Sequence, residues 1–227
     1  LRRGALVLAV GVVTLTLVGY TVLFCPRVRR NGSRMAGLAL VLLGAITLAC
    51  LGTATYPQLG PLTTITPTVF VALLVSIGYD RRAALAYALL QGLIACIALH
   101  ATIGTMATMI TAIACVVTLA KEIRGRNSLL RLSFVTAASA ALSSIGFGLI
   151  ERPLLLGAAQ GGTLDSGMAV LREILQDAGF LAAGVLVVGS ATLFILPLLE
   201  RLFDVATGMT LMELRDPRQP LLRELQV

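Results

Sequence analysis

The chain has 227 residues, of which 57% are hydrophobic and only 13% are charged, and its mean hydropathy is +0.93. Soluble globular domains carry about 25% charged residues, so this composition excludes a soluble domain and indicates a membrane protein. The net charge of +7 does not indicate nucleic-acid binding, because the basic residues form short clusters between apolar runs with few aromatic residues to stack on bases.

Charged or Pro/Gly-rich breaks divide the sequence into seven apolar segments. Each predicts a helix, because lipid offers no hydrogen bonds to an open backbone. The segments cover residues 5–25, 35–55, 62–78, 83–100, 103–120, 129–150 and 178–199. The third to fifth are at or below the ~20 residues that a perpendicular span requires, so six full spans remain an alternative. The predicted fold is all-α, a polytopic bundle of seven transmembrane helices over residues 1–199 with a cytoplasmic amphipathic linker over residues 200–227.

The first segment has the basic start of a signal peptide. We interpret it as a retained helix, because it is long enough for a span and no A-x-A-like cleavage site follows it.

Basic residues are unevenly distributed between the connections. If seven spans alternate in direction, 14 of the 18 basic residues lie on one side and only Arg2, Arg3, Arg152 and Arg172 lie on the other. The positive-inside rule assigns the richer side to the cytoplasm. This predicts an amino terminus outside and a carboxyl terminus inside.

Residues 165–179 have an amphipathic pattern ahead of the last segment. Met168, Leu171, Ile174 and Leu175 share one helical face, while Arg172, Glu173 and Asp177 lie elsewhere. The pattern predicts a short helix at the outer membrane interface, and packing against the bundle is an equally good interpretation.

Few bulky polar groups lie within the segments. Pro67 is expected to kink the third segment, Tyr87 and Gln91 share a face of the fourth, and His100 lies between the fourth and fifth. These four residues form a candidate bundle pocket, although hydrogen bonding between helices or at the interface is the more ordinary interpretation.

The sequence contains no motif for catalysis or metal binding, so no catalytic residue and no metal ligand is predicted in this chain. The single cysteines are interpreted as small buried hydrophobes (Cys25, Cys50, Cys96 and Cys115). A pump or an intramembrane protease is disfavoured, because either normally needs ionisable groups at depth. A small membrane transporter or permease for neutral or lipid-like cargo remains an alternative, as does a structural scaffold subunit.

The last segment continues as an apolar stripe from Leu198 to Val205, which predicts a helix that leaves the membrane. Thr210 and Glu213 fit a capping box, which predicts a second short helix ending near Asp216. Pro220 fits the first turn of a third helix.

This tail resembles the junction in the seven-transmembrane HD family of bacterial membrane phosphohydrolases, whose members include cyclic di-AMP phosphodiesterases. The matching residues are Pro197, Glu200, Phe203, Thr207, Leu211, Glu213, Leu214, Asp216, Pro220, Leu221, Leu222 and Leu225. The bundle adds a weaker likeness in its seven spans, the proline in the third, the Asp-Arg turn after it and the basic loop before the sixth.

The resemblance implies an extracellular domain before the bundle and a cytoplasmic HD domain after Val227, and the start at Leu1 fits an excerpt of such a protein. We expect a sensor and anchor module in the bacterial inner membrane. Its expected coupling linker comprises Glu200, Phe203, Thr207, Thr210, Glu213, Leu214, Asp216, Pro220, Leu221 and Leu222.

The implied partners are the lipid bilayer and the protein's own extracellular and HD domains, with a homodimer left open and no nucleic acid expected. The resemblance gives the full-length protein a metal-dependent phosphodiesterase activity. The divalent metal, Mn or Fe, and its ligands belong to the HD domain, so this chain needs no cofactor.

Overall fold

The structure is a computed structural model that describes residues 2–25, 32–120, 126–152 and 164–203. Its helices are α1 (Arg2–Phe24), α3 (Gly32–Thr55), α4 (Gly60–Gly78), α5 (Arg81–Ala98), α6 (Ile103–Leu119), α7 (Arg126–Glu151) and α9 (Leu164–Phe203), with a 3-10 turn η1 (Pro57–Leu59) before α4. All seven predicted segments are helical, and the described residues contain no strand. The predicted all-α polytopic bundle is confirmed.

Six of the described helices are long and apolar enough to cross a membrane, and α6 is a shorter apolar helix of 17 residues. At 1.5 Å per residue α6 is about 26 Å long, slightly less than the ~30 Å hydrocarbon core. Hydrophobic side chains cover much of the outer surface, including Val7, Leu15, Leu40 and Phe194. Such side chains are suited to contact with lipid.

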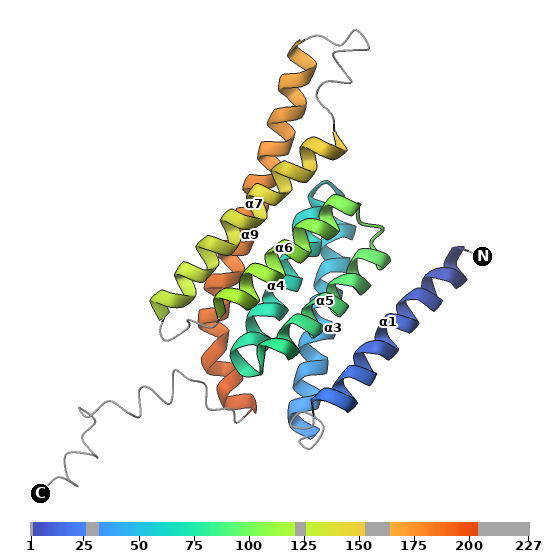
Figure 1. Ribbon diagram of the computed structural model, residues 1–227, viewed down its shortest axis with the longest axis vertical. Helices are drawn as coiled ribbons and strands as arrows, with labels where there is room; N and C mark the ends of the chain where they lie inside the picture. The colour runs from blue at the N-terminus through green and yellow to red at the C-terminus, as the bar shows by residue number, and fades with distance from the viewer. Residues whose placement is uncertain (1, 26–31, 121–125, 153–163, 204–227) are drawn as a thin grey trace, which may run out of the picture.

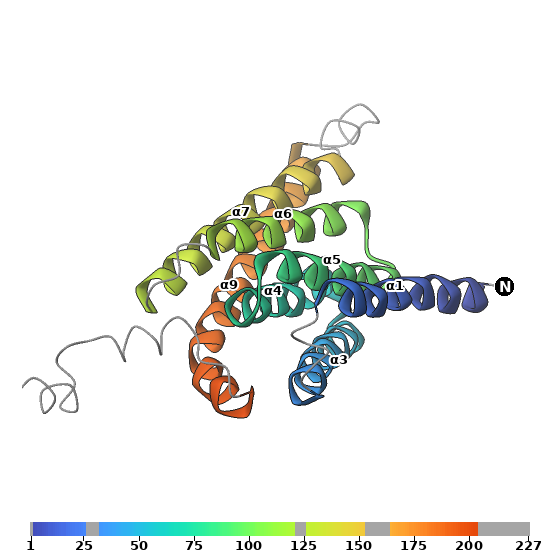
Figure 2. The ribbon, with the colours of Figure 1, turned by 60° about the horizontal axis from the view of Figure 1, so that its bottom comes forward.

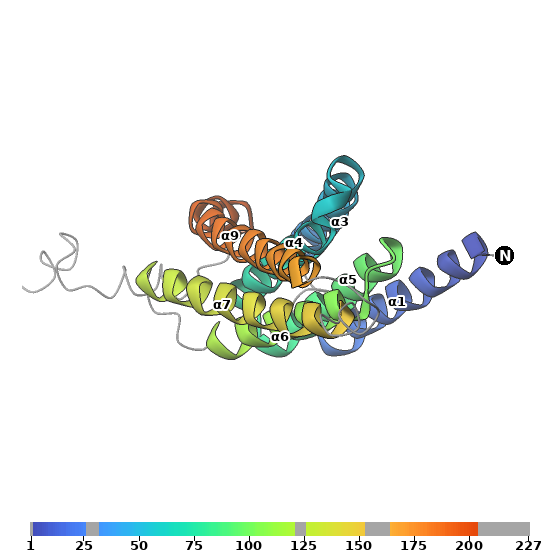
Figure 3. The same cartoon turned by 90° about the horizontal axis from the view of Figure 1, so that it is seen from above.

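The helices form two layers (Figure 1). Figure 2 shows α1 at the edge of the bundle, where it packs against α5. Seen from above in Figure 3, α7, α6, α5 and α1 form one row, and α9, α4 and α3 form the other. The pairs of helices in contact follow this order.

Helix α4 occupies the centre of the bundle. It contacts α3 and α9 in its own layer and α5 and α6 in the other. A helix covered on all sides needs apolar or small residues all round, and the buried positions of α4 include Ile65, Val69, Ala72 and Leu73. Pro67 also lies inside α4 and is buried.

Helix α9 corrects one prediction. Residues 165–179, expected to form a separate interfacial helix, are the first part of α9, which continues without a break to Phe203. Ile174 is only 2% exposed and lies against Gly148 of α7. Of the predicted apolar face, only Ile174 is covered by α7, whereas Met168 and Leu175 are 68% and 51% exposed.

Candidate functional site: a cavity at one end of the bundle

A cavity of about 490 Å³ opens at the end of the bundle that carries η1. The connection from α3 to α4, the connection from α5 to α6 and the end of α7 all line it, together with Ile174 and Asp177 of α9. Three alternate helix ends therefore meet at one end of the bundle. Helices that alternate in direction along the chain place every second connection at the same end of the bundle, as seen here.

Threonine hydroxyls line the deeper part of the cavity. Thr64 of α4 and Thr105 and Thr108 of α6 are each at most 9% exposed. The Thr64 hydroxyl donates to the Gly60 carbonyl, and the Thr108 hydroxyl donates to the Gly104 carbonyl, both at 2.8 Å. Because each hydroxyl gives its only proton to the backbone, its oxygen remains an acceptor.

The amino-terminal end of α6 forms one wall. Thr102 is its N-cap, and its hydroxyl oxygen accepts a hydrogen bond of 3.2 Å from the Thr105 backbone N–H. Glu151, the last residue of α7, accepts a 2.6 Å hydrogen bond from the Gly104 backbone N–H. A carboxylate is stabilised there by the free N–H groups and by the helix dipole. Glu151 thus joins α7 to α6 at the cavity.

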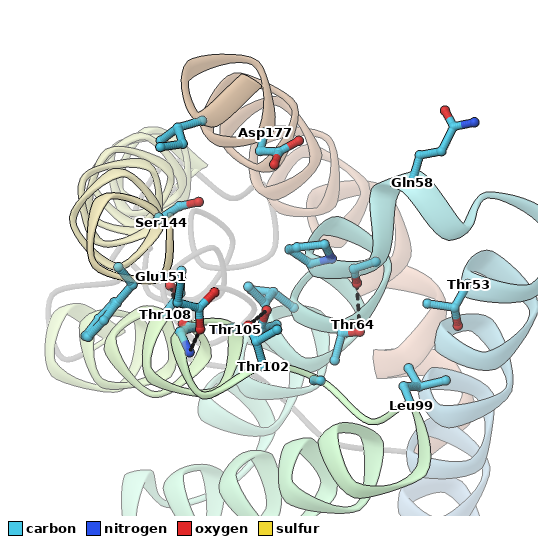
Figure 4. A pocket seen from close by; sticks show the side chains of 18 of the residues that line it. Thr53, Gln58, Thr64, Leu99, Thr102, Thr105, Thr108, Ser144, Glu151 and Asp177 are labelled. Carbon is cyan, nitrogen blue, oxygen red and sulfur yellow. Dashed lines mark hydrogen bonds between the residues drawn. The ribbon is translucent and has the colours of Figure 1, made fainter. Parts of the chain in front are cut away.

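Asp177 on α9 lies on a different wall from Glu151, and Figure 4 shows the open space between the side chains around them. The Arg152 guanidinium lies 3.4 Å from the Asp177 carboxylate and 3.5 Å from that of Glu173. Both ion pairs are partly exposed, so each contributes at most about 1 kcal/mol to stability. Their main effect is to hold the end of α7 beside α9.

Of the four residues predicted to form a pocket, only His100 lines this cavity. It has a φ of 53°, the left-handed conformation that usually favours glycine. Its N–H bonds to the Ile97 carbonyl at 3.4 Å, and the Ala101 N–H bonds to the Cys96 carbonyl at 3.0 Å. This pair of bonds is a Schellman motif, which ends α5 and turns the chain toward α6.

The other three predicted pocket residues do not line the cavity. Pro67 lies within α4, and Tyr87 is fully buried, with its hydroxyl donating to the Thr21 hydroxyl of α1 at 2.8 Å. Gln91 is also fully buried, and neither its amide nitrogen nor its amide oxygen has a hydrogen-bond partner. The structure therefore does not bring the four residues together.

Sequence reasoning missed Glu151, Asp177 and the α6 threonines as a group. The amphipathic pattern placed Asp177 only in the predicted interfacial helix. The N-cap pattern around Thr102 was the available signal, since it marks free N–H groups beside the start of α6.

Most of the predicted coupling linker has no structural test. Glu200 and Phe203 belong to the last turns of α9. The remaining linker residues lie outside the described residues, as do the predicted capping box and third short helix (Thr207, Thr210, Glu213, Leu214, Asp216, Pro220, Leu221 and Leu222).

The described residues contain no group of three or more His, Cys, Asp or Glu side chains that could hold a metal ion. They therefore do not fit the Mn or Fe of an HD hydrolase. All four cysteines are free, but they are not all buried as interpreted. Cys96 is buried and Cys25 and Cys115 are half-buried, whereas Cys50 is exposed on the outer surface of α3.

The family comparison covers most of the chain. A family model described as a 7TM receptor with intracellular HD hydrolase matches residues 1–207. Comparisons with curated proteins and with solved structures found no match. The matched range contains all seven helices described above. The chain is therefore a multi-pass membrane protein that belongs to the family of seven-transmembrane receptors with an intracellular HD hydrolase.

Proposed function

We propose that the chain is the sensor and anchor module of a bacterial inner-membrane receptor whose cytoplasmic HD domain hydrolyses cyclic di-AMP. The family match supports the receptor and its link to an HD hydrolase, and it favours this function over a small transporter. The resemblance of the tail to cyclic di-AMP phosphodiesterases supports the substrate. A divalent Mn or Fe ion would belong to the HD domain.

In the proposed orientation the cavity faces the outside. In the alternation predicted from the sequence, the connections and the tail that follow the opposite helix ends carry 14 of the 18 basic residues, which favours a cytoplasmic location for that end. The cavity end carries only Arg2, Arg3, Arg152 and Arg172. The carboxyl terminus is then cytoplasmic, as an attached cytoplasmic HD domain requires.

The continuity of α9 is the observation that carries the proposed mechanism. Asp177 lines the cavity, and the same helix continues to Phe203. At 1.5 Å per residue the distance along the helix is about 39 Å, enough to cross the bilayer. A shift at the cavity can therefore reach the HD domain through one helix. Such coupling needs two arrangements of α9 that both ends can bias.

A wedge between α7 and α9 tests this coupling without a ligand. A Cβ added at Gly148 would lie 3.1 Å from the Ile174 side chain, so the Gly148→Leu variant should push α9 away from α7. In the full-length protein we expect cyclic di-AMP hydrolysis to change by about twofold or more. Inserting four glycines after Phe203 should abolish this response and preserve basal hydrolysis.

A matched insertion of four alanine-rich helical residues after Phe203 is the control. It adds the same length but keeps the helix stiff, so part of the response to Gly148→Leu should survive. The coupling mechanism is wrong if the wedge has no effect, or if its effect persists through the glycine insertion. Absence of any cyclic di-AMP hydrolysis would contradict the proposed substrate.

A further inference from the structure

We propose that the cavity between Glu151 and Asp177 is a binding site for a small organic cation. The inference concerns binding alone. That such binding is the signal for the receptor rests on the proposed function.

Three of the threonine hydroxyls in the lining can act only as acceptors toward a ligand. The hydroxyl protons of Thr53, Thr64 and Thr108 are all donated to backbone carbonyls of their own helices. Their oxygens can therefore only accept a hydrogen bond from a ligand. Glu151 and Asp177 add carboxylate oxygens, which are also acceptors when ionised. A ligand that donates protons or carries positive charge fits this lining.

The net charge of the lining is negative, which also favours a cationic ligand. Glu151 and Asp177 contribute two negative charges, and Arg152 contributes one positive charge. Arg152 pairs with Asp177 and also with Glu173, which lies outside the cavity. With histidine neutral, the cavity therefore has a net negative charge, and its only formal cation is already engaged. An anionic ligand would find no unpaired basic side chain in this lining.

The size and shape of the cavity favour an organic cation over a metal ion. Within the described part of the chain no three acidic, histidine or cysteine side chains converge as metal ligands. The volume of about 490 Å³ is in the range of small-molecule sites. Pro61, Ile65, Phe147 and Ile174 provide apolar wall against which the organic part of such a ligand can pack.

Three probes of one shape and different charge test the inference. Choline, 3,3-dimethylbutan-1-ol and 3,3-dimethylbutanoate share a branched body and carry positive, zero and negative charge. We would measure their binding to the full-length protein in nanodiscs by calorimetry and by the shift in melting temperature. Choline should bind about fivefold more tightly than the neutral alcohol, and the carboxylate should bind most weakly.

Isosteric substitutions identify the charges that matter. Glu151→Gln and Asp177→Asn should each reduce the preference for choline over the alcohol, because each removes one negative charge from the lining. Glu173→Gln is the matched control, since it removes an Arg152 partner of the same charge outside the cavity. This control should leave the preference for choline within about twofold of its original value. Size-exclusion profiles would establish that each variant is folded, and Glu151→Gln carries the test if Asp177→Asn does not fold.

Equal affinity for choline and the alcohol would overturn the inference, as would tighter binding of the carboxylate. If Glu173→Gln reduced the preference for choline as much as the other two substitutions, the inference would also be overturned. The preference would then arise from the overall surface charge and not from the cavity. Because no hydrolysis is measured, these outcomes leave the proposed coupling through α9 untouched. Conversely, a failed glycine insertion would not affect the binding result.

Discussion

Glu151 and Arg152 are neighbours at the end of α7, yet they bind two different helices. Glu151 accepts the Gly104 N–H of α6 at 2.6 Å, and Arg152 lies 3.4 Å from Asp177 of α9. The pair holds the end of α7, the start of α6 and an interior turn of α9 around the cavity. A change at either residue can therefore alter how α7 sits against α6 or α9.

The contact between Glu151 and Gly104 predicts non-additive mutations. Glu151→Ala removes a charged partner from the start of α6 and should cost about 1 kcal/mol of unfolding free energy. Gly104→Ala should cost a similar amount, because its Cβ would lie 2.6 Å from the Glu151 carboxylate and displace it. The double variant should be no less stable than either single variant, since all three lose the same contact.

Denaturant titration of the purified protein in micelles measures these differences. Additive losses in the double variant would show that Gly104→Ala acts through a different contact. Glu151→Gln is the control, because its amide oxygen can still accept the Gly104 N–H and should retain part of the stability.

The positions of the helices were predictable because lipid forces long apolar runs into helices, whatever their neighbours. Individual polar contacts were not predictable in the same way. Tyr87 and Gln91 share a helical face in the sequence, but only the packing of α1 supplies Tyr87 with a partner in Thr21. Sequence spacing gives the face of a residue and not the helix that covers it.

The contacts around the cavity were also not predictable from sequence spacing. Glu151 and Gly104 are 47 positions apart, and their contact depends on α7 ending beside the start of α6. Similarly, the amphipathic pattern around Ile174 is compatible with an interface or with another helix. Ile174 packs closely at Gly148 whereas Met168 and Leu175 stay exposed, and only the three-dimensional packing shows which residue lies against α7.

The hydrogen bond from Tyr87 to Thr21 should hold α1 to the bundle. Among the main helix contacts, α1 packs against α5, and the Tyr20 hydroxyl also donates to the Arg82 carbonyl at 3.2 Å. Tyr87→Phe should lower the unfolding free energy by about 1 kcal/mol, because Thr21 loses a buried partner. Thr21→Val should have a similar effect, and the two together should be less than additive in denaturant titration. A neutral result for both variants would contradict a role for this bond.

Gln91 should be less stabilising than an apolar residue of similar size. Both of its side-chain amide atoms are buried without a partner, which costs free energy relative to solvated groups. Gln91→Leu should therefore raise the unfolding free energy by about 1–2 kcal/mol. Gln91→Ala is the control, because it removes the amide but leaves a cavity and should lose part or all of the gain. A lower melting temperature for Gln91→Leu would contradict this prediction.

The backbone at His100 predicts a stabilising glycine. With a φ of 53°, His100 has the left-handed backbone conformation, which glycine adopts without strain from a Cβ. His100→Gly should raise the unfolding free energy by about 1 kcal/mol, whereas His100→Ala should give no such gain, because alanine keeps the Cβ. Both variants lose the imidazole, so the difference between them isolates the backbone effect from any side-chain contact at the cavity. If His100→Gly proves no more stable than His100→Ala, the left-handed conformation at the end of α5 is wrong. A loss of stability in both variants by the same amount would instead show that the imidazole itself holds the connection between α5 and α6.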